Sequence, residues 1–167
     1  MDSILKKLGM PPTGYRIIPH QGHGELKRKL HISLRAWRDA ETRFLIMRDN
    51  DGGDCSARKT ELLEIITREG KLDQSRVRIV CQELEAWFLG DGEALRQAGF
   101  FGRGRAAPAI MKRDPDSVAK PSKHVRRMRP DHKKMMAAQK IAPFLDLARN
   151  RSESFRSTID AIRILTS

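Results

Sequence analysis

Arg43-Phe-Leu-Ile-Met-Arg48 and the six residues that follow it, Asp49-Asn-Asp-Gly-Gly-Asp54, decide the fold prediction. The first six residues carry a run of apolar side chains without the alternation of a half-exposed strand. Such a run is typical of a strand that is covered on both faces in a parallel sheet. Asp, Asn and Gly favour turns, so the chain is expected to leave the sheet at Asp49. We therefore predict a central strand over residues 43–48 with a polar loop at its carboxyl end.

The residues after this loop predict a helix and a second strand. Residues 56–69 place the apolar side chains between Leu62 and Ile66 inside a helix, and Gly70 fits the position after its C-terminus. Residues 76–81 are again suited to a strand. Strand, helix and strand make a parallel unit with an expected right-handed crossover. The sequence therefore predicts an α/β fold, with a compact parallel sheet flanked by helices.

The rest of the chain predicts more helices, a further strand and an irregular segment. Apolar side chains from Leu26 to Trp37 recur every three or four residues, which indicates an amphipathic helix over residues 25–37. Residues 99–131 contain four prolines and no sustained period. They predict a long irregular insertion, followed by a helical C-terminal part over residues 132–167. The other predicted elements are a helix at 2–9, a strand at 15–19, and helices at 83–89, 141–148 and 155–165.

Length and composition fit one compact domain over residues 1–167. The 33 Lys and Arg against 21 Asp and Glu give a net charge of +12, which favours phosphate-rich partners and nucleic acid first of all. No apolar run approaches the ~20 residues that cross a bilayer, and the N-terminus lacks the pattern of a secretory signal. We therefore expect a cytoplasmic protein without a membrane segment, and a homo-oligomer is left open.

Most of the positive charge lies in one segment. Residues 102–140 hold twelve Lys or Arg and three Asp, so a net +9 of the +12 is concentrated there. This concentration predicts a nucleic-acid surface, and a solvated charge run is the alternative. His20 lies in a Gly-rich stretch that suits either a phosphate-contacting loop or an ordinary turn. The residues predicted to contact phosphate or nucleic acid are Arg48, His20, Lys120, Lys123, Arg126 and Arg127.

Acidic side chains follow both predicted strands. Asp49 and Asp51 lie two residues apart at the end of the first strand, where ligands gather in open α/β sheets. They could share a hard cation such as Mg²⁺ or Mn²⁺, with Asp54 as an additional acid. Glu83 and Glu85 follow the second strand and would supply a ligand or a general base if the two strands are neighbours. The alternatives are a plain turn for the first group and favourable contact with a helix dipole for the second.

Four segments resemble a bacterial family of domains of unknown function, number 4276 among such domains, which is related to the Toprim fold. The matching segments are "YRIIPHQG", "FLIMRDNDGGDC", "VRIVCQELEAWFLGD" and "IAPFLDLARNRSESFRSTIDAIRIL", and together they span nearly the whole chain in order. The resemblance implies a Toprim-like parallel sheet with an Asp-x-Asp pair and a Glu around Mg²⁺. Asp49 and Asp51 match the Asp-x-Asp pair, and Glu83 and Glu85 match the acidic part of the third segment.

The resemblance also carries expectations about partners and about the start of the chain. Members of the family are often encoded beside ATPases in mobile or defence-related loci. They usually open with a strand that bears a Glu, and this chain is expected to lack that strand, because Met1 falls at about the helix that follows it.

Three hypotheses follow. The first is a Mg²⁺-dependent Toprim-like nuclease that hydrolyses DNA or RNA, working with an ATPase in anti-phage defence; Asp49 and Asp51 hold the metal, and Glu83 and Glu85 serve catalysis. The second is a catalytically incomplete module of the same fold that binds nucleic acid or an ATPase partner. The third is a phosphotransferase or phosphatase with Asp49 as its nucleophile, because Asp-x-Asp-Gly also occurs in such enzymes.

Overall fold

The computed structural model describes residues 1–50, 52–102, 106–131 and 133–167. Two strands, eight α-helices and four short 3-10 turns lie within these ranges. They are α1 (Asp2–Lys7), η1 (Pro12–Gly14), α2 (Gly22–Ala36), β1 (Phe44–Asp49), α3 (Cys55–Arg68), β2 (Ser75–Val80), α4 (Glu85–Leu89), α5 (Gly92–Gln97), η2 (Ala109–Lys112), η3 (Pro115–Ser117), α6 (Pro121–Met128), α7 (Lys134–Ile141), η4 (Ala142–Phe144) and α8 (Glu153–Thr166).

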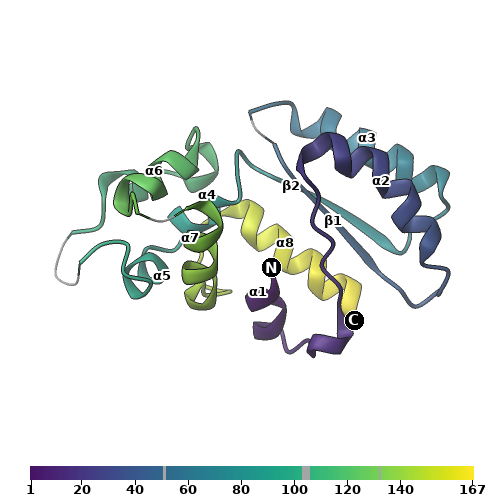
Figure 1. Ribbon diagram of the computed structural model, residues 1–167, viewed down its shortest axis with the longest axis horizontal. Coiled ribbons are helices and arrows are strands. Elements are labelled where there is room, and N and C mark those ends of the chain that lie inside the picture. Colours follow the sequence, from purple (N-terminus) through teal and green to yellow (C-terminus); the bar gives the residue numbers. More distant parts are fainter. Residues whose placement is uncertain (51, 103–105, 132) are drawn as a thin grey trace.

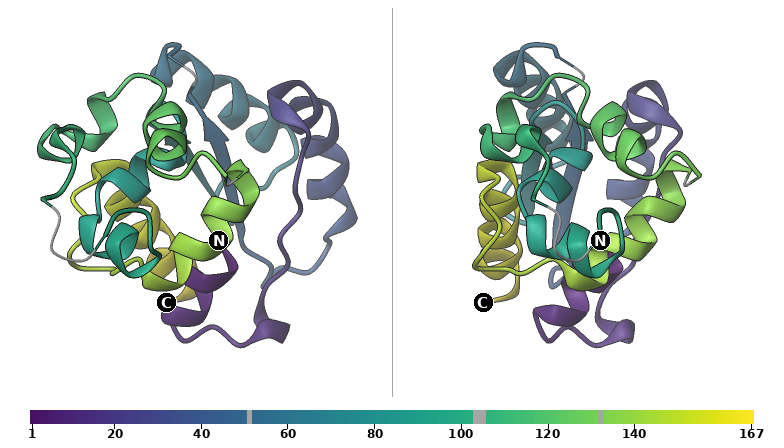
Figure 2. Two further views of the ribbon diagram at one scale, coloured as in Figure 1. Left: turned by 60° about the vertical axis from the view of Figure 1, so that its left-hand side comes forward. Right: turned by 90° about the vertical axis from the view of Figure 1, so that its left-hand side faces the viewer.

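The centre of the fold is a parallel pair of strands. Phe44 of β1 pairs with Ser75 of β2, and the register runs without a break to Asp49 and Val80. Helices α2 and α3 cover one face of this pair and α8 packs against the other, as Figures 1 and 2 show. The predicted α/β fold with parallel strands is therefore confirmed. The described residues form a sheet of two strands.

The residues on either side of helix α3 explain where it begins and where it ends. The carboxylate of Asp54 accepts hydrogen bonds from the backbone N–H groups of Ser56 and Ala57 at 2.8 and 3.3 Å, which satisfies two of the free donors at the helix start. Gly70 has a φ of +66°, a conformation that suits glycine just beyond a helix. The helix predicted over residues 56–69 is confirmed almost to the residue.

Two hydrophobic cores lie on the two sides of the sheet. The core between the sheet and helices α2 and α3 is aliphatic, and its buried members are Leu26, Leu30, Leu34, Ile46, Leu62, Ile66 and Val77. The second core is larger and joins α1 to helices α4–α8. It includes the aromatic residues Trp87 and Phe155, whose rings meet edge to face at 5.2 Å between centroids. Helices α4–α7 lie beyond the carboxyl ends of both strands (Figure 1).

The strand predicted at residues 15–19 is wrong. The chain there is extended but pairs with neither strand. Ile17 and Ile18 are 47% and 44% exposed, so neither side chain is buried as it would be in a covered strand. Pro19 has no N–H to donate to a neighbouring strand. Tyr15 instead donates a hydrogen bond from its hydroxyl to Asp2 at 2.6 Å, which ties this segment to α1.

The irregular insertion predicted at residues 99–131 is wrong in part. Its described residues contain η2, η3 and α6, and they bury Met111, Val118 and Val125 in the larger core. Proline at the first position of both η3 and α6 starts each element, because its fixed φ suits that position. Prolines that predicted irregularity therefore mark where these short elements begin.

The helix predicted at residues 141–148 is also wrong. The helix lies earlier, as α7, and ends at Ile141. Pro143 follows within η4 and cannot continue the α-helical hydrogen bonds. Among the described residues, no helix has both the length and the apolar character that a membrane crossing requires.

Candidate functional site

The carboxyl ends of both strands open at the same edge of the sheet. Asp49 ends β1 directly opposite Val80, the last residue of β2. One further hydrogen bond, from the N–H of Asn50 to the carbonyl of Val80 at 2.9 Å, carries the pairing into the loop. The side chain of Asn50 then donates to the carbonyl of Gly53 at 2.7 Å and closes this loop. Residues that follow the two strands are therefore brought to one edge, as the sequence predicted.

Glu83 and Glu85 lie beyond β2 and are held by the helices that cover this edge. A carboxylate oxygen of Glu83 accepts a hydrogen bond from the backbone N–H of Ser122 at 2.8 Å, at the start of α6. Glu85 begins α4 and is 3% exposed. The Nζ atom of Lys134, on α7, lies 3.2 Å from its Oε2. Apart from this ion pair, no residue that the structure describes donates a hydrogen bond to the buried Oε2 of Glu85.

Lys134 joins acids from both strand ends electrostatically. Burial disfavours the charge of its ammonium, but neighbouring carboxylates outweigh burial and raise its pKa above the ordinary value. Those carboxylates belong to Glu85, Glu83 and Asp49. Burial also raises the pKa of Glu85, although the charge of Lys134 acts in the opposite direction. We call Asp49, Glu83, Glu85 and Lys134 the strand-end cluster.

The other predicted acids have different positions. Asp54 caps α3 through its carboxylate, so its role in the structure is to start a helix. Asp51 lies outside the described residues. Sequence reasoning counted Lys134 only among the twelve cations of residues 102–140 and did not connect it with the acids, which lie far from it along the chain.

The three acids of the strand-end cluster offer carboxylate oxygens, the ligands that suit a hard divalent cation, whereas the ammonium of Lys134 does not bind metal. Outside residues 51, 103–105 and 132, however, no group of three or more His, Cys, Asp or Glu side chains is arranged to hold a metal ion. Glu83 is engaged at α6 and Glu85 is paired with Lys134. The acids that the structure describes therefore do not by themselves form a metal site.

Two of the predicted phosphate-contacting residues lie near the sheet. Arg48 is 7% exposed, and its guanidinium forms an ion pair with Glu61 on α3 at 3.2 Å. His20 is half-buried just before α2, and its Nδ1 is buried without a hydrogen-bond partner in the described part of the chain. Arg58, which the sequence did not single out, lies against the loop: a side chain at residue 53 would collide with its guanidinium, and Gly53 leaves room for it.

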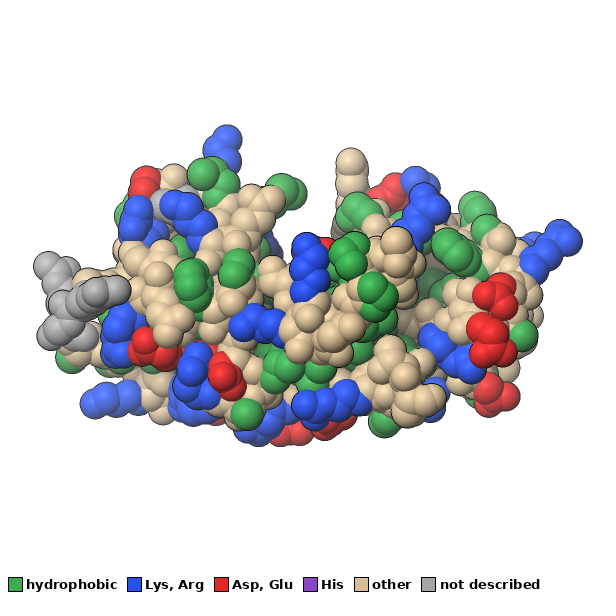
Figure 3. Space-filling model, turned by 90° about the horizontal axis from the view of Figure 1, so that it is seen from below, with side chains coloured by type: hydrophobic (Ala, Val, Ile, Leu, Met, Phe, Trp, Pro, Cys, Tyr) green, Lys and Arg blue, Asp and Glu red, His purple; other side chains and the backbone are tan. Residues whose placement is uncertain are grey.

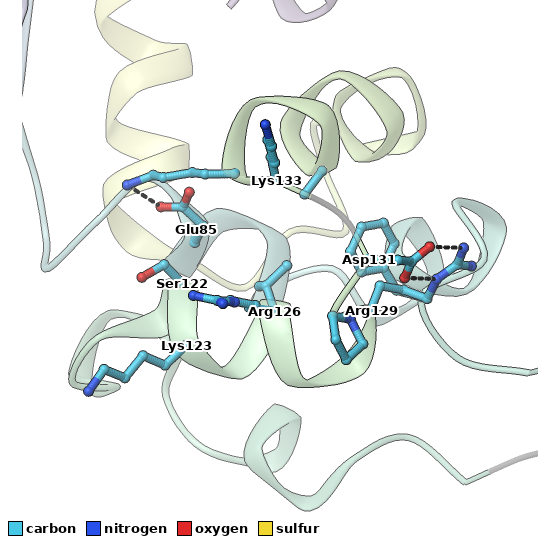
Figure 4. A pocket seen from close by; sticks show the side chains of 12 residues that line it. Glu85, Ser122, Lys123, Arg126, Arg129, Asp131 and Lys133 are labelled. Atoms are coloured by element: carbon cyan, nitrogen blue, oxygen red, sulfur yellow. Dashed lines mark hydrogen bonds and ion pairs between the residues drawn. The ribbon is translucent and has the colours of Figure 1, made fainter.

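The predicted cations of the basic segment gather on α6. Lys120 precedes the helix in a left-handed conformation, and Lys123, Arg126 and Arg127 are exposed along it. Between α6 and α7 lies a cavity of about 570 Å³, which we call the α6–α7 cleft (Figure 4). Lys123 and Arg126 line this cleft, and Arg127 does not. The structure also adds Lys133 and Lys134 to its lining.

Positive charge is not confined to the cleft. Seen from below, Lys and Arg side chains are scattered over the whole face, with smaller groups of Asp and Glu between them (Figure 3). A notch in this view separates the side that carries α4–α7 from the side that carries α2 and α3. Positive charge alone therefore does not define one binding site. What distinguishes the cations is whether their side chains line the α6–α7 cleft.

The comparisons with known proteins identify the family of the chain. No curated protein and no solved structure matches it. A family model described as a domain of unknown function (DUF4276) matches residues 3–163, which is nearly the whole chain. The resemblance inferred from the four sequence segments is confirmed: the chain belongs to the DUF4276 family.

Proposed function

We propose that this protein is a Toprim-like, metal-dependent nuclease that binds nucleic acid across α6 and α7 and hydrolyses its phosphodiesters at the strand-end cluster. The observation that carries the proposal is geometric: β1 and β2 end side by side, with Asp49 opposite Val80, and beyond β2 Glu85 is buried with Lys134 at 3.2 Å. Carboxylates at this edge are suited to a hard cation, and a cationic cleft that shares Glu85 and Lys134 with the cluster adjoins them.

The chemistry divides among the residues of the site. Asp49 and Asp51 would hold Mg²⁺ or Mn²⁺, which when bound polarises a phosphoryl oxygen and lowers the pKa of water. Glu85 would accept a proton from the attacking water, and its burial makes its ionised form the stronger base. As water attacks phosphorus, the bond to the leaving oxygen breaks and that oxygen takes up a proton from solvent water. The ammonium of Lys134 would offset the charge that develops on the phosphoryl oxygens.

A second candidate function is a non-catalytic module that binds nucleic acid or an ATPase partner. The observation that favours it is the engagement of the acids: Glu83 is bonded at α6 and Glu85 is paired with Lys134. A module of this kind would show salt-sensitive binding without turnover. For either function, an ATPase partner and a role in anti-phage defence rest on what the family resemblance implies.

Cleavage and binding measured on the same variants separate the two functions. The full chain is incubated with labelled DNA and RNA, with Mg²⁺ or with EDTA. We expect Asp49→Asn to lower cleavage by at least about 100-fold. Loss of a residue that only supports a metal ligand costs up to about 100-fold, and loss of a direct ligand should cost at least as much. Binding in EDTA should be unchanged. The matched control is Asp160→Asn, an exposed acid on α8 that should leave both properties intact.

Each outcome favours one function. Cleavage that survives in Asp49→Asn removes Asp49 from the active site and overturns the assignment. A wild-type chain that binds but does not cut with either metal favours the second candidate.

A further inference from the structure

The α6–α7 cleft has two kinds of lining. Its floor is apolar, and it is formed by side chains that are at most 5% exposed: Phe100, Val125 and Ala137. Exposed cations stand at its walls: Lys123 and Arg126 on α6, and Lys133 just before α7. The volume of about 570 Å³ falls in the range of pockets that enclose small organic ligands, ~300–1,000 Å³.

The wall cations differ in whether the protein already uses them. Arg129 donates two hydrogen bonds to the carboxylate of Asp131, both at 3.1 Å, and a third to the carbonyl of Gly99 at 2.8 Å. The side chains of Lys123, Arg126 and Lys133 make no hydrogen bond or ion pair with any residue that the structure describes. Figure 4 shows Arg126 pointing toward the end of the cleft that holds Ser122 and Glu85, away from the Arg129–Asp131 pair. Three positive charges beside an apolar floor are thus left for an external anion.

An inorganic anion would need the cations but would gain nothing from the floor. A ligand that combines a phosphate with a flat, largely apolar group would use both, and a nucleotide has this composition. A base that is stacked in a duplex cannot enter such a cleft, whereas an unpaired base can turn out and rest against apolar side chains. Glu85 and Lys134 also line the cleft, so a strand bound there would lie beside the strand-end cluster.

We propose that the α6–α7 cleft binds one unstacked nucleotide of a single-stranded nucleic acid. Arg126 contacts the phosphate of this nucleotide, Lys123 and Lys133 contact neighbouring phosphates of the strand on either side, and the base lies over the floor of Phe100, Val125 and Ala137. The inference rests on the nucleic-acid binding of the proposed function and adds the kind of strand and the residues that select it. It does not depend on hydrolysis.

Binding in EDTA tests the inference without the metal site. A fluorescent single strand of mixed sequence and its duplex are titrated with the full chain at fixed salt. We expect the single strand to bind at least about tenfold more tightly, which corresponds to ~1.4 kcal/mol. Arg126→Ala and Lys133→Ala should each weaken single-strand binding by about tenfold, as expected for a lost phosphate contact with a geometric role.

Arg127→Ala is the matched control, because Arg127 is adjacent to Arg126, is exposed on the same helix and lies outside the cleft lining. It removes the same charge and should weaken binding by no more than about twofold, the screened long-range effect of one exposed charge. Equal losses in Arg126→Ala and Arg127→Ala would mean that the surface attracts the strand by net charge alone, which overturns the inference. Tighter binding of the duplex overturns it as well.

Competition tests the apolar floor. Adenosine monophosphate should displace the single strand at concentrations at which inorganic phosphate does not. Equal displacement by the two would show that the base adds nothing, and the floor would lose its role.

Failure here is distinguishable from failure of the nuclease proposal. A chain that binds single strands through Arg126 but never cuts them retains the cleft and loses hydrolysis. A chain that cuts duplex DNA normally in Arg126→Ala retains hydrolysis and loses the cleft.

Discussion

Two halves of the molecule are held together in different ways. The sheet half, residues 22–80, packs α2, α3 and the two strands around an aliphatic core of Leu, Ile and Val side chains. The helical half, α1 with residues 81–167, has a larger core with several aromatic rings and also buries a network of polar side chains. The first half is stabilised mainly by burial of apolar area, with few buried polar side chains, whereas the second depends in addition on a network of buried side-chain hydrogen bonds.

Asp91 lies at the centre of one part of this network. Its carboxylate is 1% exposed and accepts four hydrogen bonds. Two come from the guanidinium of Arg149, at 2.9 and 3.0 Å, and two from the backbone N–H groups of Ala94 and Asp146, at 3.1 and 2.9 Å. One carboxylate thereby starts α5 and fixes the turn that leads toward α8.

Asn150 holds the other part of the network. It donates to the carbonyl of Trp87 at 2.9 Å and accepts from the N–H of Ser152 at 2.9 Å. Gly90 allows this close approach, because a side chain there would collide with the Asn150 carbonyl oxygen and the Ser152 backbone. The indole N–H of Trp87 donates to Ser154 at 3.0 Å. The comparison teaches that the half next to the candidate site is built from specific polar partners, which an apolar pattern does not reveal.

The largest expected effect comes from the aliphatic core. Leu62 is 0% exposed, and Leu62→Ala should lower the free energy of unfolding by about 4 kcal/mol through lost burial and a residual cavity. Urea unfolding measures this loss. The control is Ile32→Ala on α2, which is 58% exposed and should change stability by less than about 0.5 kcal/mol.

The same urea experiment tests whether the two halves unfold together. We expect one transition, because α8 contacts β2 and also buries Phe155 in the larger core. A separate early transition of the sheet half would show that the halves unfold independently.

The next effect comes from the polar network. Asp91→Ala leaves two backbone N–H groups and Arg149 without their acceptor. We expect a loss of about 3 kcal/mol in the same urea experiment, the lower end of the range for a broken buried pair, because Arg149 is 45% exposed and regains water. Asp160→Ala, which removes an exposed acid from α8, should cost less than about 0.5 kcal/mol. If Asp91→Ala lowers the free energy of unfolding as little as Asp160→Ala does, the polar network does not stabilise the helical half.

The smallest effect has the opposite sign. The raised pKa of Glu85 means that the unfolded chain releases this proton at a lower pH than the folded chain does. Ionisation of Glu85 therefore costs stability as the pH rises from the ordinary glutamate pKa through the raised one. Glu85→Gln removes this cost, and Lys134 is 58% exposed and stays hydrated without its partner. The variant should therefore be more stable by about 1 kcal/mol at neutral pH, the usual scale of pKa effects in folded proteins, and less so in acid.

Thermal unfolding of the wild-type protein and of the Glu85→Gln variant, each at neutral pH and at a pH below the ordinary glutamate pKa, checks this prediction. A gain at neutral pH would identify Glu85 as an acid that is retained at the expense of stability, as residues of functional sites often are. An equal loss at both pH values would instead make Glu85 an ordinary partner of Lys134.

The sequence predicted those parts of the fold that short-range patterns specify. The strand predicted over residues 43–48 corresponds to β1, and the apolar residues predicted from Leu26 to Leu34 form the buried face of α2. The segment at residues 15–19 has the composition of a strand, but neither β1 nor β2 pairs with it, and pairing is not visible in a local pattern. Pro115 and Pro121 suggested irregular chain but begin two short helical elements.

The candidate site divides in the same way. Asp49, Glu83 and Glu85 were predicted from their positions after two strands, because parallel neighbours necessarily release their chains at one edge of the sheet. The use of Asp54 as a helix cap was available from the sequence, since an Asp before a helix is a common cap. It was instead interpreted as an additional acid.

By itself, then, the sequence determined the parallel strand–helix–strand unit, the acids that follow its strands and the excess of positive charge, because each is a property of neighbouring residues. Only the tertiary structure decided that Lys134 lies among those acids and that Arg126 faces a cleft while Arg127 does not. These relations depend on how α6 and α7 pack against α4. That packing is set by contacts between residues far apart in the chain, including Asp91 with Arg149 and Trp87 with Ser154, for which no local pattern exists.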